Sequence, residues 1–138
     1  RVQSAISMSQ IAEPYIKRKA VRHLEKKRIV IFAAGTGNPF FSTVTAASLR
    51  ASEMGCSKIL KATKVNGIYD SDPNLDKNAK LIKDITYSEV ISKNLRVMDL
   101  NAISLAKESG IPIYITNIFE QDSLIRALKE EGNYSKIH

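Results

Sequence analysis

A short loop between an apolar run and a helical pattern carries the residues best suited to chemistry. Ile29–Phe32 is apolar and β-branched, and hydroxyl groups at Ser42 and Thr43 occur where a helical pattern begins. Gly35 and Gly37 would let the backbone approach a ligand closely, and free N–H groups at a helix start favour an anion, most often a phosphate. A sharp strand-to-helix connection without a ligand is the alternative, because short glycine motifs also occur by chance.

The other side chains of this loop favour the ligand-binding interpretation. Thr36 and Asn38 are short polar groups, whereas Phe40 and Phe41 offer flat apolar surface beside them. A phosphorylated molecule that carries a ring would use both kinds of surface. The loop therefore predicts a nucleotide or a similar ligand.

A second polar segment follows another predicted strand. Ile59–Ala62 has the composition of a short buried strand, and 63–73 is rich in turn residues. In an open α/β sheet, ligands bind outside the carboxyl ends of the strands. If the strands before the two polar segments are parallel neighbours, both segments should face one crevice, which would hold two ligands or two halves of one.

The remaining pattern alternates between strands and helices, which predicts an α/β fold with a mainly parallel sheet and helices on its faces. We expect one domain over residues 1–138. Further strands are expected over 2–8, 80–85 and 111–116, and helices from Glu13, over 42–54 with a stop at Gly55, over 86–92, from Asp99 to Gly110, and from Asp122 or Ser123.

Composition limits the partners and the compartment. The net charge of +7 favours anionic partners in general, but the basic residues after Pro14 lack interleaved aromatic residues, so a nucleic-acid role would rest on charge alone. No apolar run is long enough to cross a bilayer and no signal-peptide pattern is present, so we expect no membrane partner and a cytoplasmic protein. The single Cys56 is expected to be buried, without metal or redox chemistry.

Four segments, taken together, closely resemble the bacterial UMP kinases of the amino acid kinase family. They are Gly35–Thr43, Lys61–Pro73, Tyr87–Val90 and Val97–Asp99, and they follow in order along nearly the whole chain. The resemblance implies a three-layer sandwich and phosphoryl transfer from ATP to UMP, giving UDP for pyrimidine nucleotide biosynthesis, with Mg²⁺ bridging the donor phosphates. It also implies a homo-oligomer, typically a hexamer, often controlled by GTP and UTP.

The resemblance also implies roles for individual residues. It assigns UMP binding to Thr36, Gly37, Asn38, Pro39, Phe40, Phe41, Ser42 and Thr43, and ATP binding to Thr63, Tyr69 and Asp72. It leaves the catalytic residues unknown and assigns no metal ligand. Phosphoryl transfer needs in-line positioning and positive charge on the shared oxygens. Lys61 and Lys64 could supply that charge, or they could be ordinary solvated lysines, whereas Tyr69 can lie against an adenine.

Departures from the family pattern leave the activity open. Arg1 aligns well inside that pattern, so the part of the family that carries a phosphate-binding lysine and glycines is absent, and we expect a carboxy-terminal portion with about half of a site. Val44 replaces the usual Asp, which removes a partner for the catalytic lysines, and Asn66 replaces a common Asp. The alternatives are a non-catalytic nucleotide-binding or regulatory fragment, and a sibling enzyme acting on a carboxylate or carbamate, which the run Asn38–Phe41 argues against.

Overall fold

Strands and helices alternate along the chain in the computed structural model, which describes residues 1–95 and 97–138. The elements are β1 (Val2–Ser4), β2 (Glu13–Pro14), α1 (Lys17–Glu25), β3 (Ile31–Ala33), α2 (Thr43–Met54), β4 (Ile59–Thr63), β5 (Ile68–Tyr69), β6 (Leu81–Ile82), β7 (Asp84–Ile85), α3 (Tyr87–Ser92), α4 (Leu100–Ser109), β8 (Ile113–Asn117), α5 (Ser123–Leu128) and β9 (Ser135–Ile137). This order agrees with the predicted α/β class.

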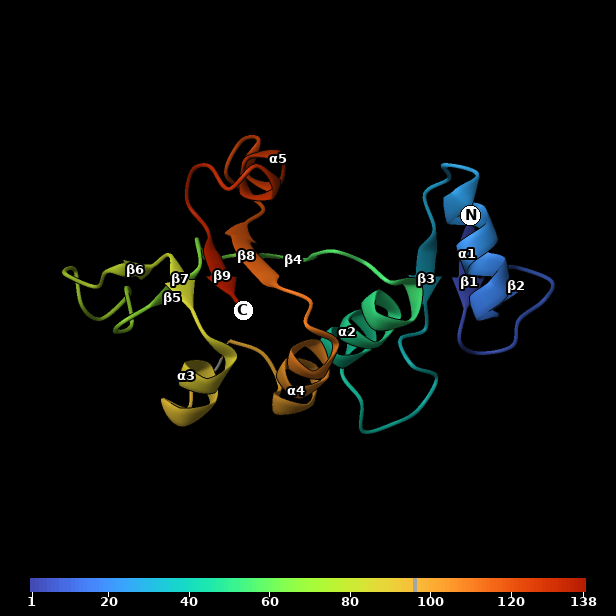
Figure 1. Ribbon diagram of the computed structural model, residues 1–138, viewed down its shortest axis with the longest axis horizontal. Coiled ribbons are helices and arrows are strands. Elements are labelled where there is room, and N and C mark those ends of the chain that lie inside the picture. Colours follow the sequence, from blue (N-terminus) through green and yellow to red (C-terminus); the bar gives the residue numbers. More distant parts are fainter. Residues whose placement is uncertain (96) are drawn as a thin grey trace.

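The strands form separate sheets within the described ranges. A three-stranded sheet has the order β2-β1-β3, a four-stranded sheet has the order β4-β8-β9-β7, and β5 and β6 form a hairpin. All pairs in the larger sheets are parallel except β8 with β9. In Figure 1 the three-stranded sheet lies on the right and the four-stranded sheet on the left. The prediction of a mainly parallel arrangement is therefore confirmed.

Helices cover both faces of the four-stranded sheet. Figure 1 shows α2, α3 and α4 below this sheet and α5 above it, and α2 packs along α4. Between the layers lies an apolar core in which Ile113 and Ile137 have no exposed surface. Burial of such side chains is the main favourable contribution to folding.

Polar caps fix the helix starts that border the site. The Ser42 hydroxyl accepts N–H groups of Val44 and Thr45 at the start of α2, which ends at Gly55 with φ of 64°. Asp99 caps α4 in the same way through the N–H of Ala102. Both starts were predicted, and because α2 and α4 lie side by side, the capping side chains meet.

Several expectations about secondary structure and burial differ from the structure. Glu13 and Pro14 do not begin a helix but pair with β1, because Tyr15 N–H donates to Ser4 O at 2.8 Å and holds this segment extended. The predicted strand at 80–85 is divided, since β6 pairs with β5 whereas β7 pairs with β9. Cys56 is exposed rather than buried, because it lies in the turn directly after Gly55.

An open groove separates the two larger sheets. Among the described residues, β3 and β4 each lack a strand partner on one edge. Side chains of both strands line a cavity of about 600 Å³, together with the small residues Ala46, Ala47 and Ala51 of α2. The lining from β3 and β4 includes the apolar Phe32 and Ile59.

Candidate functional site

The backbone of the glycine loop after β3 adopts angles that favour glycine and is ordered by hydrogen bonds within the loop. Gly35 and Gly37 have φ of 59° and 76°, values that L residues rarely adopt. Gly37 N–H donates to Ala34 O at 3.0 Å, and a Cβ at position 37 would lie 3.0 Å from Ala5 O. The Thr36 hydroxyl accepts the N–H of Asn38 at 3.1 Å. Glycine is therefore required at position 37, and the loop is ordered by its own hydrogen bonds.

This loop lines a cavity of about 530 Å³. Of the residues predicted to bind UMP, the cavity is lined by Thr36, Gly37, Asn38, Pro39, Phe41 and Thr43. Phe40 is fully exposed, and Ser42 turns instead to the start of α4. The structure thus gathers most of the predicted residues around one space of suitable size, while their role in binding stays a prediction.

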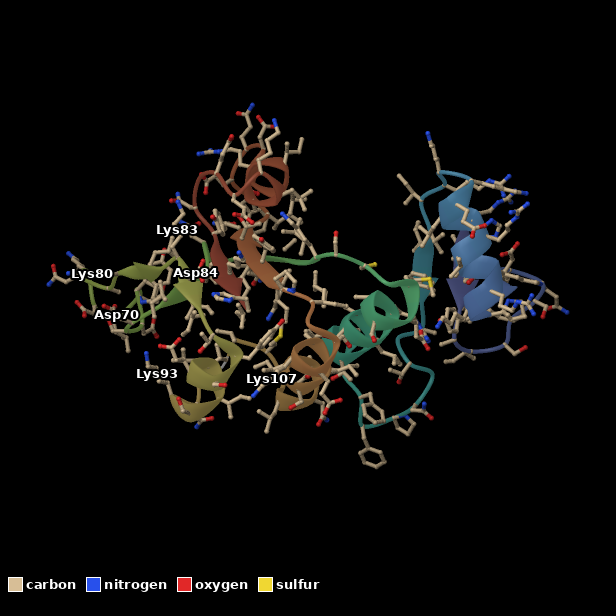
Figure 2. All side chains as sticks on the ribbon, viewed as in Figure 1. Asp70, Lys80, Lys83, Asp84, Lys93 and Lys107 are labelled. Atoms are coloured by element: carbon tan, nitrogen blue, oxygen red, sulfur yellow. The ribbon has the colours of Figure 1, made fainter. Side chains whose placement is uncertain are left out.

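A second cavity, of about 590 Å³, lies beyond the carboxyl end of β4. All three residues predicted to contact ATP, Thr63, Tyr69 and Asp72, line it together with Lys61. Lys64 is exposed and does not belong to the lining, so the structure separates the two candidate lysines. In Figure 2, Asp70 and Lys80 lie near the end of the hairpin that borders this cavity, and Lys80 N–H donates to the Asp70 carboxylate at 2.7 Å.

The expectation that both polar loops face a single crevice is not met. The condition for it was that β3 and β4 are parallel neighbours, and in the described chain they belong to different sheets. Each loop therefore lines a cavity of its own.

Asp99 joins the start of α4 to the start of α2, a role that sequence analysis did not assign to it beyond capping. Its carboxylate accepts the Ser42 hydroxyl, the Thr45 hydroxyl at 2.7 Å and the Ala102 N–H at 3.0 Å. Burial alone would raise the pKa of Asp99, but these hydrogen bonds and the charge of Lys61 outweigh it and hold the pKa below the usual value. Asp99 therefore stays ionised at the junction of α2 and α4.

Lys61 of β4 supplies a positive charge near this junction. Its ammonium group donates to Val97 O, and burial lowers its pKa while the negative charge of Asp99 opposes that shift. Because Lys61 also lines the second cavity, its positive charge would lie close to any ligand held there. Such a charge suits the phosphate end of a nucleotide.

Comparison with known proteins identifies the family. Residues 4–117 match the Amino acid kinase family. This chain belongs to that family.

Individual relatives make the similarity more specific. A uridylate kinase of Neorickettsia sennetsu is 52% identical over 137 residues, which are 99% of this chain and 59% of that protein. The chloroplastic uridylate kinase PUMPKIN of Arabidopsis thaliana is 54% identical over 131 residues, which are 95% of this chain and 39% of that protein. The crystal structure of UMP kinase from Ureaplasma parvum superposes with a TM-score of 0.94 at 34% identity, covering 99% of this chain and 58% of that one.

These findings confirm the resemblance to UMP kinases and the amino acid kinase fold. The chain spans only 39% to 59% of the length of these three relatives. Their activity as whole proteins is therefore a basis for proposals about this chain.

The two departures from the family pattern lie near different cavities. Val44 is partly exposed in the first turn of α2, where its N–H donates to the Ser42 hydroxyl at 3.1 Å. The Asn66 side chain accepts a 3.0 Å hydrogen bond from Asn117. Asn66 thus fixes the start of the loop that leads to β5. The carboxylate at the start of α2 comes from Asp99 of the neighbouring helix in this chain.

The described ranges of the chain hold no group of three or more His, Cys, Asp or Glu side chains placed to bind a metal ion. Mg²⁺ commonly keeps several waters and binds through one or two carboxylates plus substrate phosphates, so such a protein cage is not required for it. Within the same ranges, none of the helices has the length and apolar character needed to cross a membrane.

Proposed function

We propose that this amino acid kinase takes part in phosphoryl transfer from ATP to UMP. A phosphate oxygen of UMP would attack the γ-phosphorus of ATP, giving UDP and ADP. The observation that carries the proposal is the hydrogen bonding that leads from the cavity at the β4 end to the start of α2. Lys61 lines this cavity and bonds Val97 O, two residues before Asp99, and Asp99 bonds Ser42 at the start of α2. The names of the relatives supply UMP as the acceptor. ATP as the donor follows from the resemblance to the UMP kinases.

We assign one nucleotide to each of the two cavities. UMP would use the loop Thr36–Thr43, whose amides and hydroxyls suit a phosphate and whose Asn38 suits a ring edge. ATP would lie against Tyr69, with Thr63 and Asp72 beside it and Lys61 near the transferring group. Positioning and fixed charge of this kind account for most of the catalysis in phosphoryl transfer.

Other parts of the proposal rest on the resemblance alone. Mg²⁺ would enter with ATP and neutralise charge on its phosphates. Assembly into a homo-oligomer such as a hexamer, control by GTP or UTP, a cytoplasmic location and a single domain whose carboxy-terminal part is residues 1–138 are proposed on the same basis. The chloroplastic relative shows that related kinases also occur in an organelle.

A second candidate is a nucleotide-binding protein without turnover. The apolar Val44 favours it, because the family's usual carboxylate is missing at that position. Under this proposal the chain would bind UMP at the glycine loop and release it unchanged.

Calorimetry and a coupled assay on the 138-residue chain test these proposals. We expect UMP to bind more tightly than AMP. Because Val44 replaces the family's carboxylate, we expect UDP formation that is detectable but far below the usual kinase range of about 1 to 100 per second. Equal affinity for UMP and AMP would contradict the assignment of the acceptor. Ordinary turnover from material of confirmed mass would exclude the non-catalytic candidate, and phosphorylation of carbamate or glutamate instead of UMP would favour a sibling activity.

A further inference from the structure

Ser135 makes a close contact with the hairpin that borders the second cavity. This serine of β9 has no exposed surface. Its hydroxyl accepts the N–H of Ile68 at 2.7 Å and donates to Ile82 O at 2.5 Å, so a single side chain bonds both strands of the β5–β6 hairpin. Ile68 and Ile82 are partners in the hairpin register, which places the hydroxyl at the base of the hairpin.

Gly67 shows how tightly the hairpin sits on Ser135. A Cβ at position 67 would lie 2.3 Å from the Ser135 hydroxyl oxygen and 2.9 Å from a methyl carbon of Leu81. Its φ of 156° lies in a region that L side chains rarely adopt. The glycine is therefore needed for the backbone to reach Ser135, and the hydroxyl and the glycine form one interlocking contact.

This contact determines where the proposed ATP-binding residues lie. The hairpin forms a sheet of its own and shares no strand pairing with the four-stranded sheet in the described part of the chain. Tyr69 directly follows Ile68, and the loop containing Asp72 begins one residue after Tyr69. The hydroxyl of Ser135 thus connects the hairpin, which borders the cavity, to the four-stranded sheet. Ser135 itself is not part of the cavity lining.

We propose that Ser135 is a positioning residue for the nucleotide donor: its hydroxyl holds the β5–β6 hairpin so that Tyr69 and Asp72 face the donor. The proposal rests on the proposed function of the second cavity as the ATP site. It differs from a purely structural role in being local, because the hydroxyl bonds the hairpin, whereas the glycine loop that would hold UMP lines a different cavity.

The test compares Ser135→Ala and Ser135→Thr with the unaltered 138-residue chain. The alanine leaves a buried N–H and a carbonyl without a partner, whereas threonine keeps the hydroxyl. Ser92→Ala is the matched control, because it removes the same group from an exposed helix serine. Two quantities are measured: amide exchange at Ile68 and Tyr69, and the dissociation constants of ATP and UMP.

Ser135→Ala should accelerate exchange at Ile68 and Tyr69 and weaken ATP binding by about tenfold, while UMP binding stays within about twofold. Ser135→Thr should recover most of the ATP affinity, and Ser92→Ala should change neither quantity. Equal weakening of both nucleotides, or faster exchange without any change in ATP affinity, would overturn the proposal. Absence of ATP binding in the unaltered chain would instead reject the proposed function of the cavity.

Gly67→Ala provides an independent arm if Ser135→Ala fails to fold. The new methyl group would collide with the Ser135 hydroxyl, so ATP affinity should again fall selectively. Where Ser135→Ala folds, the double variant of Gly67→Ala and Ser135→Ala lacks the closest contact, and its combined loss of ATP affinity should be smaller than the product of the single losses. Independent, multiplicative losses would show that Gly67 and Ser135 do not act as one contact, which would overturn the proposal.

Discussion

The Thr45 hydroxyl donates a 2.7 Å hydrogen bond to the carboxylate of Asp99, and this bond joins the first turn of α2 to the start of α4. The residues are 54 positions apart, yet each belongs to the start of a helix. Because α2 follows the glycine loop, the position of that loop depends on a carboxylate supplied from a distant part of the chain. The ammonium group of Lys61 bonds Val97 O, two residues before Asp99, so a change at Asp99 should affect both stability and ligand binding.

Replacement of Asp99 should change the stability of the protein in acid. Its pKa lies below the ordinary value, so the ionised group stabilises the fold above the unfolded-state pKa of about 3.9, and this contribution is lost as the pH falls through the folded-state pKa. Asp99→Asn should therefore be less stable than the unaltered protein at pH 7, with a difference that shrinks below about pH 3.9. Urea denaturation between pH 7 and a pH below about 3.9 measures this difference in the free energy of unfolding. Asp122→Asn is the control, because Asp122 makes no side-chain cap. A difference independent of pH would contradict the assignment.

Replacement of Lys61 should weaken ATP binding with little effect on the stability of the protein. Burial already disfavours its charged form, so Lys61→Met should leave the melting temperature nearly unchanged. ATP affinity should fall by roughly 1.5 to 3 kcal/mol, the range for a hydrogen bond to a charged group. Lys64→Met is the matched control, since Lys64 is exposed and outside the cavity lining. Similar ATP affinities for the two variants, measured by calorimetry, would remove Lys61 from the site.

Asn38 should contribute to UMP binding without contributing to the fold. Its side chain is exposed and makes only a 3.5 Å contact with Thr36 O. Asn38→Ala should weaken UMP binding by roughly 1 to 3 kcal/mol if a desolvated partner loses its hydrogen bond, while thermal denaturation stays unchanged. ATP affinity, measured in the same titrations, provides the internal control. Unchanged UMP affinity would reject this contact.

Restoring the family's carboxylate should raise the reaction rate in a form of the protein that carries the family's lysines. Val44→Asp should increase kcat more than it changes KM, because oriented lysines matter most as charge develops on the transferring group. Val44 is partly exposed in the first helical turn, where a carboxylate is favourable. Val44→Asn is the uncharged control. An unchanged kcat together with a lower melting temperature would assign Val44 to packing alone.

Local patterns were sufficient to predict the helix starts that build the site. Ser42 and Asp99 each occur just before an apolar periodic segment, and both cap a helix in the structure. A capping residue satisfies groups within a few positions of itself, so its effect is visible in a short stretch of sequence. The same patterns do not reveal that the two caps bond to each other, because that depends on how α2 packs against α4.

The short strands were harder to predict, for a related reason. β9 contains only Ser135, Lys136 and Ile137, and it exists because these residues pair with β7 and β8. A segment of this length has too few positions to show an alternating pattern. Glu13 and Pro14 likewise pair with β1 despite a composition typical of a helix start. The role of Ser135 could therefore not be predicted from the sequence, because it depends on how the strands pair.

The unpartnered edges of β3 and β4 determine how the chain should behave in concentrated solution. A free strand edge presents backbone donors and acceptors that can pair with another extended peptide, and charged residues oppose such pairing. β4 contains Lys61, whereas β3 contains no charged residue or proline and begins at Ile31, which is 57% exposed. Self-association of the isolated chain should therefore start at β3, and a single lysine at Ile31 should be enough to keep it dispersed.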